Sequence, residues 1–151
     1  MLMDKQVLVS DQQTIAVAAG NLLCTDAIDL GLAGTVPGGL VGSFIRDMGR
    51  GGHPQMEVVV TEQVASAGAS TTQFQLVTAD DAALSTNLTV INETPAIPKA
   101  TLVPGYRARL AIPPGITQRY LGVRYVIGTA TQTAGKVTAG LVYDIQETFI
   151  G

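Results

Sequence analysis

The residues best suited to chemistry are few in this chain, and His53 is its single histidine. A lone histidine excludes metal sites built on paired histidines and limits any Ser-His-Asp arrangement to one built on His53 itself. The nearest acids, Asp47 and Glu57, lie in or beside the same Gly- and Pro-rich stretch, so no rigid carboxylate is available to orient the ring. We therefore predict that His53 is a loop or contact residue.

A glycine-rich run, Gly-Arg-Gly-Gly at 49–52, is similar in composition to a phosphate-binding loop. Such loops need a strand before them and a helix after them, whereas Pro54 and a β-type run follow here. We interpret the run as part of a flexible loop whose Arg46 and Arg50 meet acidic neighbouring subunits. The predicted partner contacts are Arg46, Arg50, Gly51, Gly52 and His53.

The acidic residues also favour structural roles. Asp80 and Asp81 are adjacent, and adjacent side chains on a turn diverge, so a turn or helix cap is predicted in place of acid–base work or cation binding. Asp26 and Asp29 are interpreted in the same way. We predict no catalytic residue, no metal ligand and no cofactor. Four arginines on late strands form either a solvated face or a salt-bridging surface for a partner: Arg107, Arg109, Arg119 and Arg124.

Composition narrows the function classes further. The 151 residues fit one domain, and only 14% are charged, against about a quarter in typical soluble proteins. A weakly charged surface suits a chain packed against neighbours. The net charge of −3 and the scattered basic residues argue against direct nucleic-acid binding. No long apolar run or signal-peptide pattern is present. We therefore expect that the chain is made in the cytoplasm and does not insert into a membrane. The one cysteine, Cys24, is expected to act as a small buried hydrophobe.

Glycine and proline punctuate short runs rich in Val, Ile, Thr and Tyr, which is typical of many strands joined by turns. We predict an all-β, single-domain β-sandwich over residues 1–151, with eight to ten strands in a jelly roll. In one run, Leu121, Val123, Tyr125 and Ile127 share an apolar face. The predicted strands are 6–10, 14–18, 27–31, 55–65, 71–78, 87–94, 106–112, 119–127 and 136–145.

Three connections have specific predictions. Residues 66–70 are expected to form a hairpin, and residues 80–85 one helical turn begun by an aspartate. The least regular stretch, 31–54, is predicted to be an irregular contact loop, because loops of that length in compact domains are usually functional or disordered.

Several short phrases, in order along most of the chain, carry a likeness to a known family. They are Gln6–Gln13, Ala27–Gly31, Thr72–Asp81, Ala96–Pro98 with Val103–Gly105, Pro113–Gly115 with Arg119–Tyr125, and Gly135–Val142. Together they resemble the cement (decoration) proteins of tailed-bacteriophage capsids. The stretch 31–54 departs from this likeness.

The resemblance implies a jelly-roll protein on the outer surface of the virion capsid. It implies homo-oligomers, dimers or trimers, that bridge adjacent major capsid protein subunits and resist internal genome pressure. It carries over no catalytic residue. Many modest contacts on a closed lattice would hold the shell by multivalency. Deleting residues 38–52 is expected to leave the fold intact and to weaken capsid binding.

Two other functions stay open. One is a carbohydrate- or receptor-binding β-sandwich on the virion surface, against which stand the absence of Trp and the presence of only four Tyr. The other is a small β-fold enzyme of the cupin kind, which generally needs several metal-binding histidines where this chain has one.

Overall fold

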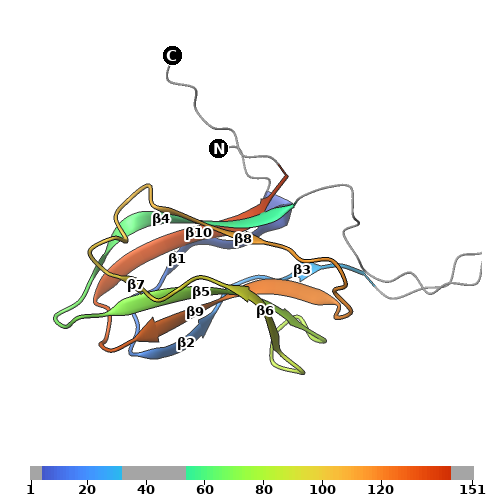
Figure 1. The fold of residues 1–151 in the computed structure, drawn as a ribbon, viewed down its shortest axis with the longest axis horizontal. Coiled ribbons are helices and arrows are strands. Elements are labelled where there is room, and N and C mark those ends of the chain that lie inside the picture. The colour runs from blue at the N-terminus through green and yellow to red at the C-terminus, as the bar shows by residue number, and fades with distance from the viewer. Residues whose placement is uncertain (1–4, 32–53, 144–151) are drawn as a thin grey trace, which may run out of the picture.

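The computed structural model describes residues 5–31 and 54–143, and this part of the chain is all-β (Figure 1). A single 3-10 turn, Lys5–Val7, precedes the strands. The ten strands of the described segments are β1 Leu8–Thr14, β2 Gly20–Leu23, β3 Ile28–Asp29, β4 Gln55–Ala65, β5 Thr71–Ala79, β6 Thr89–Glu93, β7 Ile97–Pro98, β8 Arg107–Ala111, β9 Tyr120–Gly128 and β10 Ala134–Val142. None of the described segments is a helix of the length and apolarity that a bilayer span requires.

The strands form two antiparallel sheets that pack face to face. Sheet A has the order β1-β10-β4-β8, and sheet B has the order β2-β9-β5-β6, with β3 also pairing with β9 and β7 with β5. Figure 1 shows the two sheets as separate layers, with β8 at one edge of sheet A. The predicted β-sandwich is confirmed.

The connectivity is that of a jelly roll. Four antiparallel pairings, β1 with β10, β2 and β3 with β9, β4 with β8, and β5 with β6 and β7, make one long hairpin of strand pairs. The hairpin is wrapped so that β10 also pairs with β4 and β9 with β5. Without the two-residue strands β3 and β7, eight strands remain, and eight strands wrapped in this way into two sheets are the defining topology of the fold.

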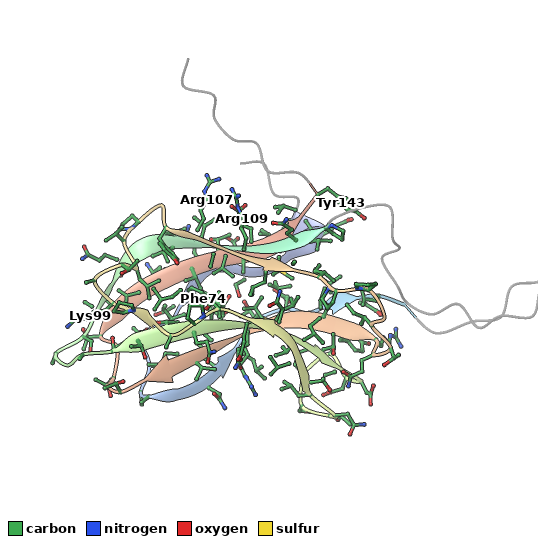
Figure 2. The ribbon with its side chains drawn as sticks, viewed as in Figure 1. Phe74, Lys99, Arg107, Arg109 and Tyr143 are labelled. Atoms are coloured by element: carbon green, nitrogen blue, oxygen red, sulfur yellow. The ribbon has the colours of Figure 1, made fainter. Side chains whose placement is uncertain are left out.

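The core lies between the sheets and follows the period-2 alternation of the strands. The apolar face predicted for β9 is correct, because Leu121, Val123, Tyr125 and Ile127 are all buried. Phe74 from β5 meets Tyr125 edge-to-face, with ring centroids 5.9 Å apart, and Figure 2 shows Phe74 between the layers.

The hydroxyl of Tyr125 is a polar group buried inside this core. It donates to Ser10 Oγ at 2.8 Å, and burial raises the pKa of Tyr125. This hydrogen bond ties β9 of sheet B to β1 of sheet A, so it fixes how one layer sits on the other.

The predicted break within the first strand is wrong. Strand β1 runs through the polar residues 11–13, and of the predicted strand 14–18 only Thr14 is in a strand. The polar residues bulge out of the ladder instead: Gln12 has a φ of 49°, and the register with β10 shifts between Ser10 and Gln13. Gln13 then accepts from Ser10 Oγ at 2.6 Å and donates to the Leu23 carbonyl at 2.8 Å. A bulge satisfied by its own side chains has therefore replaced the expected end of the strand.

The predicted hairpin at 66–70 is also wrong. β4 belongs to sheet A and β5 to sheet B, so this connection crosses between layers. It is held at both ends by other loops, since Ser66 Oγ donates to the Thr131 carbonyl at 2.6 Å and Lys99 N donates to the Ser70 carbonyl at 3.0 Å. A short Gly-containing link between two strands has the same sequence signature in either arrangement.

Candidate functional site

The predicted contact residues lie outside the described part of the chain. Arg46, Arg50, Gly51, Gly52 and His53 all fall between Gly31 and Pro54, where the chain leaves sheet B after β3 and enters sheet A at β4. The candidate surfaces that the structure does describe are the outer faces of the two sheets, which differ sharply.

The outer face of sheet B carries a second apolar cluster. The connection between β5 and β6, residues 80–88, folds over this face, and we call it the sheet B cap. Its Leu84 is 2% exposed and packs with Val77 and Ala79. Leu84 lies directly over Gly122 of β9, where a Cβ atom in place of the glycine hydrogen would approach Leu84 Cδ1 to 2.5 Å and Cys24 Sγ to 2.8 Å. The cap thus depends on the absence of a side chain at Gly122.

The sheet B cap is held in shape by Asp81. Its carboxylate accepts from Ser85 N at 2.8 Å, Ser85 Oγ at 2.7 Å and Thr86 N at 2.7 Å. These hydrogen bonds lower the pKa of Asp81 to about 2. The predicted helical turn at 80–85 is a set of non-helical turns in the structure, whereas the turn-forming role of this aspartate is confirmed.

Cys24 packs against both apolar clusters and is half-buried. Its sulfur accepts from Val123 N at 3.2 Å, and burial raises the pKa of the thiol to about 11. A thiol held neutral in this way is a poor nucleophile, which fits the structural role predicted for it.

Beyond the cap, the outer face of sheet B is crossed by a closed polar network. Arg124 Nε donates to Gln75 Oε1 at 2.8 Å, and Gln75 Nε2 donates to Glu93 Oε2 at 2.7 Å. At the end of the same sheet, Arg119 binds Asp29 through two parallel hydrogen bonds of 2.8 and 2.7 Å. Both arginines of sheet B are therefore engaged by side chains of this chain.

The outer face of sheet A presents its arginines differently. Arg107 and Arg109 lie two residues apart on the edge strand β8, opposite Val59 and Glu57 of β4. Arg107 Nη1 is 3.6 Å and Arg109 Nε 3.7 Å from the same atom, Glu57 Oε1. The two arginine side chains are 42% and 36% exposed and that of Glu57 only 3%. Figure 2 shows both arginines projecting outward from the layer, on the side away from Phe74.

The contacts of the two guanidinium groups with Glu57 Oε1 are therefore ionic, because both distances exceed hydrogen-bond length. Glu57 Oε1 is one of three buried side-chain polar atoms without a hydrogen-bond partner in the described residues, beside Ser70 Oγ and Gln132 Oε1, and it alone belongs to a charged group. We call Glu57, Arg107 and Arg109 the arginine-pair site. The chain thus keeps a buried carboxylate that its neighbours only partly satisfy, which calls for a functional explanation.

The sequence predicted half of this arrangement. It placed the arginines on a strand that faces either solvent or a partner, but it gave Glu57 no role beyond that of an acid near His53. The available signal was a single carboxylate in the apolar run 56–60 of β4. Linking it to β8 requires the strand register, which the sequence does not contain.

One exposed aromatic residue lies on the same layer. Tyr143 follows the last residue of β10, is 71% exposed and projects from the sheet A side of the molecule (Figure 2). The other large hydrophobic residues exposed in the described segments are Val90 and Val103, at 37% and 42%. Tyrosine and arginine are among the residue types that contribute most to protein interfaces.

In the segments that the structure describes, no three His, Cys, Asp or Glu residues are grouped closely enough to bind a metal ion. What the arrangement offers is charge and hydrogen-bond donors at a sheet edge, which suit binding to another molecule.

A comparison with protein-family models finds a match. The family model described as Bbp16 matches residues 9–141. The chain belongs to the Bbp16 family. The Bbp16 match begins in β1 and ends in β10, so it spans the whole sandwich, including the stretch between β3 and β4. A search of curated proteins found no match.

Proposed function

We propose that this chain is a non-enzymatic capsid cement protein. It would bind the outer surface of a phage capsid as a homo-oligomer and stabilise the shell by bridging adjacent major capsid protein subunits. The proposal starts from the sequence resemblance. The sequence phrases that resemble phage cement proteins lie almost entirely within the Bbp16 match, and they fall on strands and turns of a jelly roll.

The observation that carries the proposal is the asymmetry of the sandwich. One outer face is partly covered by the sheet B cap, and the arginines on that side are bound by side chains of this chain. The other has two arginines at an edge strand whose hydrogen-bond donors are unused by the described residues. A protein with one self-contained face and one face rich in unused donors suits attachment to a surface.

The described polar groups support a binding role over a catalytic one. The carboxylate of Asp81 shapes a turn, that of Asp29 binds an arginine, and the Cys24 thiol is held neutral by burial. A catalytic site needs a nucleophile or base beside an orienting group and a position for substrate. The polar groups of the sandwich are instead spread over its two faces and its turns.

The mechanism follows from geometry and number. A sandwich fixed by a buried core keeps its outer face rigid, so little conformational entropy is lost when it docks. A homo-oligomer presents that face at least twice and can therefore hold two capsid subunits at once. Bridging converts the second contact into an intramolecular event, so modest individual affinities add up to a shell that resists disruption.

The test is co-sedimentation of the purified full chain with capsids of its phage assembled without it, followed by heating of the decorated and bare shells. We expect saturable binding at a ratio fixed by the lattice, and a higher disruption temperature for decorated shells. Binding without a change in disruption temperature would reduce the role to decoration alone. An absence of binding would overturn the proposal and favour the carbohydrate-binding alternative, which glycan arrays would then test.

A further inference from the structure

We infer that the arginine-pair site binds one carboxylate, supplied by an Asp or Glu side chain on the outer surface of a major capsid subunit. This inference rests on the proposed function, and it names the part of the chain that makes the contact and the chemistry that the partner must offer.

The four described arginines fall into two classes. Arg119 shows what a satisfied arginine looks like in this protein: Nε and Nη2 each donate to one oxygen of Asp29, at 2.8 and 2.7 Å. Arg124 donates to Gln75 at 2.8 Å. The backbones of Arg107 and Arg109 pair with β4, but their guanidinium groups make no hydrogen bond with any described residue. Their one ionic partner, Glu57, is reached at 3.6 and 3.7 Å. Their donors are therefore available to a ligand.

The charge balance of the site indicates which ligand it would take. Two guanidinium groups face one carboxylate, so the site carries one uncompensated positive charge. An arginine fork matches the two oxygens of a carboxylate, as the pairing of Arg119 with Asp29 illustrates. One incoming carboxylate would both neutralise the site and occupy its donors. A polyanion such as nucleic acid would need a longer basic stripe, and the net charge of −3 opposes it.

Glu57 gives the site its shape. Its side chain is 3% exposed and touches both arginines through the same oxygen, so it holds the two guanidinium groups on one side of β8. Two like charges two residues apart on one strand face would otherwise repel. Glu57 is thus a positioning residue, and a buried carboxylate with incomplete hydrogen bonding is understandable if it serves this arrangement.

The position of the site in the fold suits docking. β8 is an edge strand, and Figure 2 shows the two arginines projecting from the layer on the side away from the core. A partner can approach them without opening either sheet. Rigid strands also fix the separation of the two arginines, and fixed donors favour one geometry of the bound carboxylate over others.

The test is a neutralised site with a matched control. Replacing the arginines alone would leave Glu57 buried without a counter-ion, so the variant is Glu57→Gln, Arg107→Gln and Arg109→Gln together. It removes two positive charges and one negative charge. The control, Lys136→Gln, removes one positive charge from an exposed pair with Glu62. Each variant is therefore one unit more negative than the wild-type net charge of −3.

Binding of wild type, triple variant and control to capsids assembled without this protein is measured at low and high salt, after urea unfolding shows that all three are folded. We expect the triple variant to bind about tenfold more weakly at low salt and to lose most of its salt dependence, because it lacks the exposed positive charges whose attraction to the partner salt screens. The control should bind within about twofold of wild type, because its ion pair is exposed.

The outcomes separate the two proposals. If wild type does not bind capsids, the proposed function fails. If wild type binds and the triple variant binds equally well with the same salt dependence, the cement role stands and the arginine-pair site is wrong. Equal loss in the control would show a general effect of net charge and would also overturn the site.

Discussion

The two outer faces of this sandwich differ in how their side chains are used. On sheet B, the connection between β5 and β6 returns over the strands and buries Leu84 against Gly122, so that face contributes to folding. On sheet A, Arg107 and Arg109 project outward above a buried, incompletely hydrogen-bonded Glu57. The guanidinium donors on that face are therefore not used by the described residues. If the proposed function is correct, the difference teaches that folding stability and partner binding can be assigned to separate faces of one small jelly roll.

The two faces should respond differently to substitution. Changes on the outer face of sheet B should lower the free energy of unfolding and leave capsid binding by the folded protein unchanged. Changes at the arginine-pair site and at Tyr143, on the sheet A side, should weaken capsid binding and leave the free energy of unfolding nearly unchanged.

The largest expected effect comes from Leu84→Ala on the sheet B cap. Removing a buried leucine side chain over Gly122 leaves a cavity, so the free energy of unfolding should fall by about 2–3 kcal/mol. Urea unfolding measures the loss, and co-sedimentation of the folded variant with capsids should match wild type. The matched control is Val103→Ala at a position 42% exposed, where the loss should stay below about 0.5 kcal/mol. Equal losses in the two variants would show that the cap is not a core.

The opposite change at the same place should also destabilise. Gly122→Ala puts a methyl group 2.5 Å from Leu84 Cδ1 and 2.8 Å from Cys24 Sγ, so the cap must shift or lift. We expect a loss of about 1–2 kcal/mol from overpacking. The double variant Gly122→Ala with Leu84→Ala should recover part of the loss, because the alanine at 84 makes room. Strict additivity of the two losses in urea unfolding would contradict the contact.

On the sheet A side, Tyr143→Ala should weaken binding and leave stability unchanged. The side chain is 71% exposed, so its removal costs little in the folded monomer. If it lies in the contact with the capsid, the dissociation constant should rise about three- to tenfold, equivalent to about 1 kcal/mol. Tyr143→Phe keeps the ring and should bind nearly as wild type. Unchanged binding of the alanine variant would restrict the contact to the region of β8.

The smallest effect is expected for Asp81→Asn, and its signature is pH dependence. The pKa of Asp81 is lowered to about 2 in the folded protein, below its ordinary value of about 3.9, so folding favours the charged form. Its contribution is therefore complete above about pH 4 and is lost as pH falls towards 2. The asparagine variant should be less stable than wild type at about pH 6, and the difference in urea midpoint should close by about pH 2. A difference that does not change with pH would assign the turn to other contacts.

Much of the fold could be predicted from local pattern. The runs 55–65 and 119–127 alternate or remain apolar over lengths that suit strands, and the structure has strands there within one residue at each end. The jelly-roll class followed from the number of such runs and their spacing. These features depend on residues that are close together in the sequence, so the sequence alone is enough to predict them.

The misses share a physical cause. Gln12 and Gln13 are polar residues of a kind that often ends a strand. They continue β1 because Gln12 accepts from Thr61 Oγ1 of β4 and Gln13 donates to the Leu23 carbonyl of β2. Residues 66–70 cross between sheets because β4 finds its partners in β10 and β8. In each case the deciding contacts join residues from different strands, which local pattern does not encode.

The part of Glu57 in the arginine-pair site was missed for the same reason. Glu57 and Arg109 face each other only through the register of β4 with β8. The residues that were singled out, Arg46, Arg50, Gly51, Gly52 and His53, lie outside the described part of the chain and stay predictions. Deleting residues 38–52 and measuring capsid binding still tests them separately from the site on β8.

The contrast between the two faces is tested most directly by amide hydrogen exchange of the full-length protein, free and bound to capsids. We predict that binding slows exchange in residues 107–111 of β8 and leaves residues 80–88 of the sheet B cap unchanged. Slowed exchange in 80–88 with none in 107–111 would contradict the assignment of the two faces, and the sheet B cap would then become the docking surface.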